Sequence, residues 1–230
     1  MFSLPPARLG RTGLMVSRVG FGGYRIHEHD PDHRVALKAA ITAGVNLIDT
    51  SFNYTDGSSE RLIGSVLMDM INEGTAKRDE LIIVTKAGFI QGAALGEANK
   101  MKSRGELWND VSGMANETWH CTAREVLAHS ITQSLERLHV DAIDVLLIHN
   151  PEVFFKASRK NIEDRRLFLK RMLNAFKHLE GEVERGRIKH YGVSSNGFPE
   201  PENQSLHVPL KKLFELAKEA AGSDNHHFSV

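Results

Sequence analysis

Several features that would assign a chain to a special class of protein are scarce or missing in this sequence. It contains a single cysteine, Cys121, so no disulfide can form within the chain. Lysine plus arginine and aspartate plus glutamate both number 29, so no net charge favours a nucleic acid or an anionic membrane as a partner. No apolar run approaches the roughly 20 residues of a membrane-spanning helix, and residues 1–6 lack the charged and apolar regions of a signal peptide. Together these absences predict a reducing, cytoplasmic compartment.

The composition that remains is that of an ordinary globular protein. The 230 residues are 41% hydrophobic and 25% charged. A chain of this length can bury one sizeable core. We therefore expect a single domain over residues 1–230.

Short apolar runs typical of buried strands alternate with stretches of helical periodicity. The strands are predicted to begin near residues 19, 45, 81, 143 and 188. Ahead of them, a glycine-containing turn between two apolar segments predicts a hairpin over about residues 7–17. A serine cap at Ser58 or Ser59 and a capping box at Thr122 and Glu125 mark two helix starts. Start and stop signals place the helices at about 31–44, 58–72, 122–138, 161–186 and 209–222.

Residues 87–121 interrupt this alternation. The stretch is rich in glycine, alanine and asparagine, and its periodicity is weak. We interpret it as an insertion over one face of the domain and not as an element of the scaffold. Without it, about five strand–helix units remain.

Alternating strands and helices are typical of an α/β fold with a parallel sheet. Both a doubly wound sheet and a (β/α)8 barrel produce this order. No G-x-G-x-x-G motif joins a strand to a helix. Gly20 and Gly22 match its first two glycines, but the last glycine of the motif is missing and no helix follows at once. The doubly wound dinucleotide-binding fold loses support for this reason, and we expect a (β/α)8 TIM barrel.

Four polar residues lie at or just beyond the ends of predicted strands. Asp49, Lys86 and His149 end the second, third and fourth strands, and Tyr54 follows Asp49 by five residues. The carboxyl ends of parallel strands are where such folds build their sites. We therefore expect these four side chains to carry chemistry.

Motifs of one known family run in order along nearly the whole chain, at 9–17, 19–23, 46–54, 59–64, 83–86, 134–138, 144–149 and 191–196. On these residues the sequence resembles the aldo-keto reductases, NADPH-dependent enzymes on a (β/α)8 barrel whose bottom is closed by an N-terminal hairpin. The resemblance implies that Asp49, Tyr54, Lys86 and His149 are the family's catalytic tetrad. It also implies reduction of a small-molecule aldehyde, ketone or sugar carbonyl, or oxidation of the corresponding alcohol.

The same resemblance assigns residues to the cofactor, which is expected to be NADPH, with NADH as the alternative. The residues after the fifth strand match positions that hold the nicotinamide carboxamide, although Ser194 fits the serine of this pair as well as Ser195 does. The residues after the first strand match a loop beside the cofactor. The predicted cofactor-binding residues are Gly23, Tyr24, Asp49, Ser195 and Asn196.

Four aromatic residues are expected to frame the substrate. Trp108 and Trp119 lie in the insertion, and Phe154 and Phe155 lie in the loop after the fourth strand. A mostly apolar rim of this kind suits a neutral or weakly polar carbonyl compound.

The chemistry of carbonyl reduction gives each tetrad residue a task. The nicotinamide carries the hydride, so the protein has to position the reactants and supply a proton. A phenol with a pKa of about 10 needs a nearby cation to stabilise its anion, and Lys86 would supply that cation to Tyr54. Asp49 would keep Lys86 charged and oriented, and His149 would hydrogen-bond the carbonyl oxygen. Tyr54 is then the general acid of reduction and the general base of alcohol oxidation.

A (β/α)8 barrel needs eight strands and typically about 250 residues, whereas this sequence supplies about five strand–helix units and the hairpin. In the family, strand six would begin near residues 228–230, so strands six to eight are expected to be missing, together with the cofactor-gripping residues they carry. Open sheet edges favour self-association. We therefore expect negligible reductase activity from the 230-residue chain alone.

Two other functions stay open at this stage. A catalytically silent, reductase-like binding or regulatory protein would keep the fold without turnover. A metal-dependent barrel hydrolase would use Asp49, Lys86 and His149, but the first strand lacks the H-x-H motif of that class.

Three further residues invite a zinc interpretation. His120 and Cys121 are adjacent, and His129 follows eight residues after Cys121. This spacing matches no usual structural zinc motif. No metal site is predicted.

Overall fold

The computed structural model describes residues 5–113, 118–158 and 161–229. Its centre is a parallel sheet of five strands in the order β3-β4-β5-β8-β9. All five predicted strands are present, although β3 is shorter than expected. This confirms the α/β fold with a parallel sheet. The strands are β3 (Phe21–Gly22), β4 (Leu47–Asp49), β5 (Ile82–Ala87), β8 (Ile143–His149) and β9 (Ile188–Ser194).

The two central strands, β5 and β8, are buried along their whole length. Strands covered on both faces have nearly continuous apolar sequences, which is why these two gave clear signals. Their register pairs Lys86 with Leu147, and the register of β8 with β9 pairs His149 with Ser194. The carboxyl ends of neighbouring strands therefore lie at one edge of the sheet.

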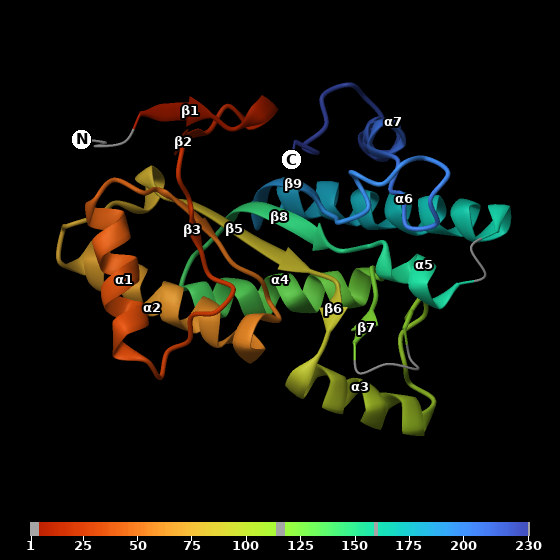
Figure 1. Ribbon diagram of the computed structural model, residues 1–230, viewed down its shortest axis with the longest axis horizontal. Coiled ribbons are helices and arrows are strands. Elements are labelled where there is room, and N and C mark those ends of the chain that lie inside the picture. The colour runs from red at the N-terminus through yellow and green to blue at the C-terminus, as the bar shows by residue number, and fades with distance from the viewer. Residues whose placement is uncertain (1–4, 114–117, 159–160, 230) are drawn as a thin grey trace.

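Helices α1, α2, α4, α6 and α7 follow the strands of the central sheet in turn and lie around its outer side (Figure 1). Each contributes a fully buried side chain to the main core. No helix in the described part of the chain is both long and apolar enough to cross a bilayer. The helices are α1 (Pro31–Thr42), α2 (Ser58–Asn72), α4 (Arg124–Leu138), α6 (Ile162–Glu184) and α7 (Leu210–Ala221). Their fully buried residues include Leu37, Ile63, Leu127, Phe176 and Leu213.

Both predicted side-chain caps are wrong. The residue before α2 is Gly57, with φ of 79°, and no side chain caps this helix. Ser59 instead donates to the carbonyl oxygen of Gly23, because it faces the neighbouring loop. Helix α4 begins at Arg124 after Ala123, one residue later than the capping box of Thr122 requires, and it has no side-chain cap either.

The segment 87–121 contains a helix that the sequence analysis did not predict. Helix α3 (Gly92–Arg104) stands between the strands β6 (Phe89–Ile90) and β7 (Trp119–His120), which pair antiparallel. Its periodicity is weak because it contains two glycines, Gly92 and Gly96, and has a mostly exposed surface. A small core of its own packs it against α4: Ile90, Ala98, Trp119, Cys121 and Val126. A second short helix, α5 (Val153–Ala157), lies in the loop after β8.

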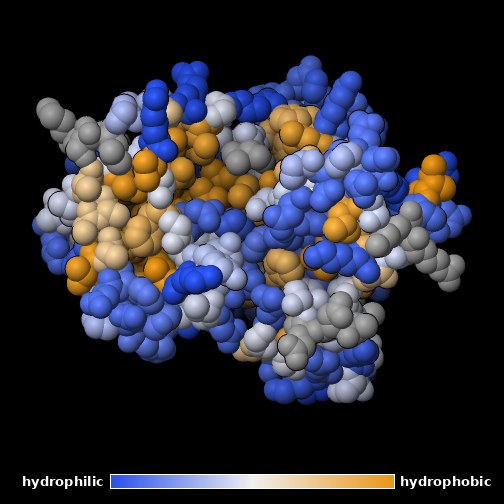
Figure 2. Space-filling view, viewed as in Figure 1, coloured by the Kyte–Doolittle hydropathy of each residue, from blue (hydrophilic) through white to orange (hydrophobic). Residues whose placement is uncertain are grey.

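A β-hairpin covers the inner face of the sheet. Its strands, β1 (Pro6–Arg8) and β2 (Met15–Ser17), pair antiparallel over the range expected for the hairpin. Figure 2 shows hydrophobic side chains gathered on the molecule beside this hairpin. Leucines of the hairpin turn pack against side chains of β5 and β8 that alternate with those of the main core: Leu9, Leu14, Val84, Val145 and Leu147.

Replacing Asn46 with alanine is expected to lower the free energy of unfolding by about 2–4 kcal/mol. Its buried side chain accepts from the Ser17 amide at 2.6 Å and donates to the carbonyl oxygens of Met15 at 3.0 Å and Glu80 at 3.1 Å. Alanine leaves these backbone groups unpaired and releases the hairpin. Urea unfolding measures the effect, with the exposed Asn72→Ala as the matched control. Equal stability of the two variants would refute the role of Asn46.

The C-terminal segment adds to the sheet edge at β9. The Tyr191 amide donates to the His227 carbonyl at 3.1 Å, and the Ser229 amide donates to the Tyr191 carbonyl at 2.9 Å. Phe228, which is fully buried, forms an isolated parallel bridge with Tyr191. This is the place at which a sixth strand was expected to begin. The barrel beyond it stays a prediction.

Candidate active site

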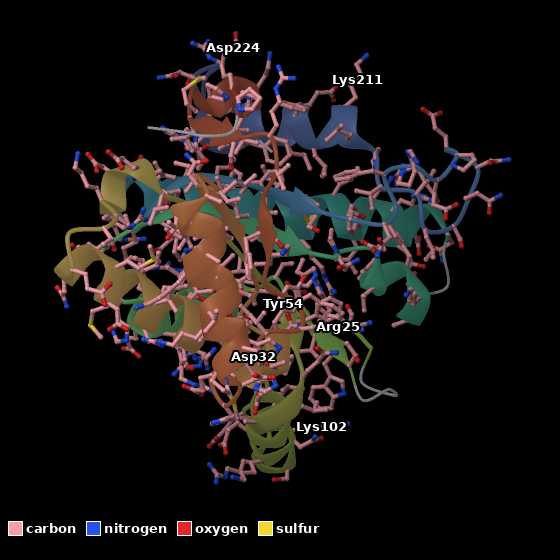
Figure 3. All side chains as sticks on the ribbon, turned by 60° about the vertical axis from the view of Figure 1, so that its left-hand side comes forward. Arg25, Asp32, Tyr54, Lys102, Lys211 and Asp224 are labelled. Carbon is pink, nitrogen blue, oxygen red and sulfur yellow. The ribbon has the colours of Figure 1, made fainter. Side chains whose placement is uncertain are left out.

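The structure brings the four predicted tetrad residues together at the carboxyl edge of the sheet. Asp49, Lys86 and His149 end the neighbouring strands β4, β5 and β8, and Tyr54 lies in the loop after β4. The rings of Tyr54 and His149 approach edge to face, with centroids 5.8 Å apart. Tyr54 is labelled in Figure 3. Sequence reasoning therefore found residues that form one cluster, and their catalytic roles stay predictions.

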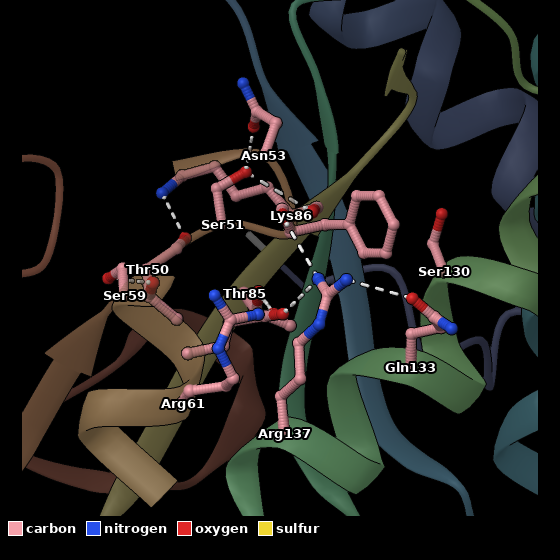
Figure 4. A network of polar contacts seen from close by, with 12 residues as sticks. Thr50, Ser51, Asn53, Ser59, Arg61, Thr85, Lys86, Ser130, Gln133 and Arg137 are labelled. Carbon is pink, nitrogen blue, oxygen red and sulfur yellow. Dashed lines mark hydrogen bonds and ion pairs between the residues drawn. The ribbon is translucent and has the colours of Figure 1, made fainter. Parts of the chain in front are cut away.

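The Lys86 ammonium group is the centre of this cluster. It is buried and donates to Asp49 Oδ2 at 2.6 Å, to the Thr50 carbonyl at 2.7 Å and to the Tyr54 hydroxyl at 3.4 Å; Figure 4 shows its contact with Thr50. Burial lowers the pKa of Lys86, and the Asp49 carboxylate opposes that shift. Three acceptors match the three N–H bonds of a charged ammonium.

Tyr54 is held by a strained turn. It begins the 3-10 turn Tyr54–Gly57, in which Thr55 and Asp56 have φ values of 46° and 54°. Such left-handed conformations are unfavourable for residues other than glycine and persist only where the surroundings fix them. The Thr55 hydroxyl donates to the Ile26 carbonyl at 2.9 Å, which is one such restraint.

The Tyr54 phenol is fully protonated at neutral pH. Burial and the negative charge of Asp49 raise its pKa to about 12. Among the residues that the structure describes, none is seen to accept a hydrogen bond from this hydroxyl, whereas its oxygen accepts from Lys86. The phenol proton is therefore available to a molecule bound at the edge of the sheet.

His149 is a neutral imidazole. Burial, followed by the nearby Lys86 charge, lowers its pKa to about 3. Its Nδ1 lies 3.1 Å from Ser51 Oγ, which also lies 2.6 Å from Asn53 Oδ1. A serine has one proton, so Ser51 can donate to only one of them. Donation to His149 Nδ1 leaves Nε2 as the N–H donor of the ring.

Acid is expected to destabilise the protein because two buried histidines resist protonation. Burial lowers the pKa of His120 to about 4 and that of His149 to about 3, from 6.5. Their contribution to the free energy of unfolding is complete above pH 6.5 and falls as the pH approaches 4 and 3, because the unfolded chain binds protons first.

Replacing His120 with glutamine should reduce the loss of unfolding free energy between pH 7 and pH 4 by roughly 2–3 kcal/mol. Glutamine does not titrate and can still donate to the His149 carbonyl, which His120 Nε2 contacts at 2.8 Å. Urea unfolding at the two pH values measures this. The exposed His139→Asn, which suits the left-handed backbone there (φ of 53°), is the control. An unchanged pH dependence in His120→Gln would contradict the assignment.

A buried ion pair supports the loop that carries the site, and sequence reasoning gave it no role. Glu60 is fully buried, accepts from Thr85 Oγ1 at 2.7 Å and faces the Arg137 guanidinium at 3.3 Å. The same guanidinium, of the Arg137 labelled in Figure 4, donates to the Phe52 carbonyl at 3.3 Å. The pair thus joins α2, β5 and α4 beneath residues 50–53. Its only sequence signal was the match at 59–64 and 134–138.

The predicted carboxamide-binding residues are arranged around a buried carboxylate. Ser195 Oγ donates to Glu152 Oε2 at 2.6 Å, and the Asn196 amide donates to Glu152 Oε1 at 3.1 Å. The Asn150 side chain also donates to Glu152, at 2.6 Å. The Asn196 side chain itself is exposed. Glu152 is a residue that sequence reasoning missed, since nothing near it in the sequence shows that it contacts the loop after β9.

Gly23 and Tyr24 lie beside the tetrad. A Cβ at Gly23 would come within 2.9 Å of the Asp49 carbonyl and 2.8 Å of Ser59 Oγ, so close packing alone requires glycine there. Tyr24 is exposed, and its ring meets the Tyr54 ring edge to face at 5.0 Å. Contact of either residue with a cofactor stays a prediction.

A hollow of about 410 Å³ opens beside Tyr54. It is lined by Tyr24, Arg25, Asn53, Tyr54, Thr55 and Gln91, two of which are labelled in Figure 3. Of the four aromatic residues expected to frame a substrate, Trp108 lines an adjoining cavity of about 600 Å³ under α3. Trp119, Phe154 and Phe155 are buried and do not line the hollow, and their contact with a substrate stays a prediction.

Comparison with known proteins finds relatives that are named as reductases or dehydrogenases. The chain is 29% identical over 202 residues to the D-threo-aldose 1-dehydrogenase of Pseudomonas sp, covering 85% of this chain and 54% of that protein. It is 27% identical over 149 residues to the NADH-specific methylglyoxal reductase of Escherichia coli (strain K12), covering 61% of this chain and 40% of that protein. The chain spans about half the length of the curated relatives it matches.

The chain is also similar to a solved structure of a reductase. An aldo-keto reductase of Bombyx mori in complex with NADP is 26% identical, with a TM-score of 0.53 over 83% of this chain and 50% of that one. The family model described as Aldo/keto reductase family matches residues 18–206, which include all four tetrad residues. The chain belongs to the aldo/keto reductase family.

Proposed function

We propose that the protein containing this chain reduces the carbonyl group of a small aldehyde, ketone or sugar with a nicotinamide cofactor. The observation that carries the proposal is the Lys86 ammonium, whose three hydrogen bonds join Asp49, Thr50 and Tyr54 in one unit. A proton donor stabilised by a buried cation is what hydride addition to a carbonyl requires of a protein.

Tyr54 gives its proton to the carbonyl oxygen as negative charge develops there. The phenol is a far stronger acid than the alcohol formed, even with its pKa raised to about 12. Lys86 stabilises the resulting phenolate, because its Nζ lies 3.4 Å from the Tyr54 oxygen. Asp49 orients Lys86 at 2.6 Å. In alcohol oxidation the same proton returns to Tyr54.

His149 orients the carbonyl oxygen next to Tyr54. As a neutral ring it can donate from Nε2 when Nδ1 carries no proton, and Nδ1 can then accept the Ser51 proton, which otherwise goes to Asn53 Oδ1. Ser51 and Asn53 therefore control the form of His149 that fits this role, through distances of 3.1 Å and 2.6 Å.

The residues at the end of β9 fit the nicotinamide half of the cofactor. The cofactor would supply the hydride. Ser195 Oγ donates its proton to Glu152 and accepts from the Gly197 amide at 2.9 Å, which leaves one lone pair to accept from a carboxamide N–H. The exposed side-chain amide of Asn196 can pair with the rest of that group. We propose NADPH as the cofactor, with NADH as the alternative. The similar proteins differ in cofactor: the Escherichia coli reductase is NADH-specific, whereas the Bombyx mori reductase was solved in complex with NADP.

The test is hydride transfer itself, followed by the absorbance of the reduced nicotinamide. Methylglyoxal and an aldose serve as substrates because the relatives are named for them. Methylglyoxal is assayed with NADPH and with NADH, and the aldose with NADP+ and with NAD+, in the 230-residue chain and in the longest gene product that contains it. The proposal predicts turnover that depends on Tyr54. Absence of turnover in the longest product with either cofactor would refute it.

The second candidate is a non-catalytic, reductase-like binding or regulatory protein. It is supported by a relative named as a putative voltage-gated potassium channel subunit beta of Schizosaccharomyces pombe, to which the chain is 28% identical over 154 residues. This alternative predicts a stable fold with no cofactor binding in the longest gene product. Tight binding of NADPH or NADH would exclude it.

A further inference from the structure

The loop between β3 and α1 gathers two imidazoles and a carboxylate outside the tetrad. One nitrogen of His27, one nitrogen of His33 and one carboxylate oxygen of Asp30 all lie within 4.8 Å of one another. The two imidazole rings meet edge to face, with centroids 4.7 Å apart. The three residues stand at intervals of three along the chain, where the loop turns into the first turn of α1.

Two of these groups have unused ligand atoms. Asp30 Oδ1 accepts from the Asp32 amide at 2.9 Å and caps α1, whereas Oδ2 is directed to His33 Nε2 at 3.7 Å, beyond hydrogen-bond distance. The Nδ1 atom of His27 is shielded from solvent and has no hydrogen-bond partner among the described residues. A buried polar atom without a partner is unusual in a folded protein and calls for an explanation.

The second nitrogen of His33 lies against the backbone of His27. His33 Nδ1 accepts from the His27 amide at 3.2 Å and lies 3.4 Å from the His27 carbonyl oxygen. An ion on Nε2 would move the ring proton to Nδ1, which would then donate to that carbonyl in place of accepting from the amide. Histidine ligands commonly make such a bond to a backbone carbonyl or a carboxylate.

We propose that His27, Asp30 and His33 bind a divalent transition-metal ion, foremost Zn²⁺, with solvent completing the coordination. Two imidazoles and a carboxylate form a usual zinc ligand set. Zinc ligands lie about 2.0–2.2 Å from the ion, so the three side chains draw closer together as the ion enters. The carboxylates of Asp30 and Asp32 offset the positive end of the α1 dipole.

The role of such an ion is structural. It would tie the loop that carries Tyr24 to α1, and the Tyr24 ring packs on Tyr54 at 5.0 Å. Glu28 takes no part, because its Oε1 pairs with Arg61 at 2.6 Å and Ser58 Oγ lies 3.3 Å away. The site therefore steadies one wall of the hollow at Tyr54 without contributing to proton transfer.

The test is calorimetric titration of the EDTA-treated chain with zinc chloride. One equivalent should bind, and zinc should raise the thermal unfolding temperature. His27→Gln and His33→Gln should each weaken binding at least about tenfold. Asp30→Asn is the sharpest variant, because asparagine caps a helix as well as aspartate does but lacks the charge; it should weaken zinc binding while unfolding like the parent in EDTA. His139→Asn should bind as the parent does.

Circular dichroism in EDTA shows whether each variant folds, and Asp30→Asn keeps the test decisive if a histidine variant does not. The proposal fails if the parent binds no more tightly than His33→Gln, or if Asp30→Asn binds zinc as the parent does. Neither outcome depends on turnover, so the proposed reductase function can fail or stand separately.

Discussion

Replacing Tyr54 with phenylalanine is expected to lower the rate of carbonyl reduction at least about 100-fold, the lower end of what a general acid contributes. Phenylalanine keeps the ring between Tyr24 and His149 but removes the phenol proton. Cofactor affinity should be unchanged, because the predicted carboxamide contacts come from Ser195 and Asn196. Steady-state rates in the longest active gene product measure the effect.

The matched control for this variant is Tyr24→Phe. Tyr24 shares the ring contact with Tyr54 but is exposed and does not contact Lys86 in the described structure. Loss of the Tyr24 hydroxyl should lower the rate of carbonyl reduction far less than loss of the Tyr54 hydroxyl does. Equal effects of the two variants, or full turnover of Tyr54→Phe, would remove Tyr54 as the acid.

Replacing Gly64 with alanine is expected to destabilise the fold by more than about 3 kcal/mol. In α2 this glycine lies against α4, where a Cβ would come 2.2 Å from the Arg137 carbonyl oxygen and 2.7 Å from the Leu138 carbonyl carbon. Backbone atoms cannot rotate away as a flexible side chain can. The helices would have to separate, and the Arg137 guanidinium would move with α4 away from Glu60. Urea unfolding measures the loss.

Gly96→Ala is the same change in another helix. Gly96 is exposed in α3, and nothing lies within 4 Å of a Cβ built on it. Alanine there should stabilise the protein by up to about 1 kcal/mol, because it has the higher helix propensity. If both variants changed the free energy of unfolding in the same direction, close packing of α2 on α4 would not be the reason that position 64 requires glycine.

The parallel sheet was predictable because each of its strands can be recognised from its local sequence. Continuous apolar runs such as those of β5 and β8 reflect burial on both faces. The site was predictable for a related reason, since polar residues at the ends of such runs share one edge of the sheet. The tetrad positions of Asp49, Lys86 and His149 follow from these two regularities.

Features that depend on distant partners were not predictable. Asn46 fixes the hairpin, and Glu60 supports the loop under the site, but their partners lie many residues away. Helix α3 was missed because its apolar side chains pack into a small separate core and its outer surface is polar. The predicted cap at Ser59 failed because Ser59 donates to the Gly23 carbonyl across the fold.

The central claim is that Asp49, Lys86 and Tyr54 form one electrostatic unit. Its most direct test is a measurement of the pKa of Tyr54 in this 230-residue chain. Carbon NMR of labelled tyrosine resolves the three tyrosines, and Tyr54→Phe assigns the signal. We predict a pKa of about 12 that falls in Asp49→Asn, since burial and the Asp49 charge both raise it. A pKa near the ordinary value of about 10, unmoved by Asp49→Asn, would contradict the claim.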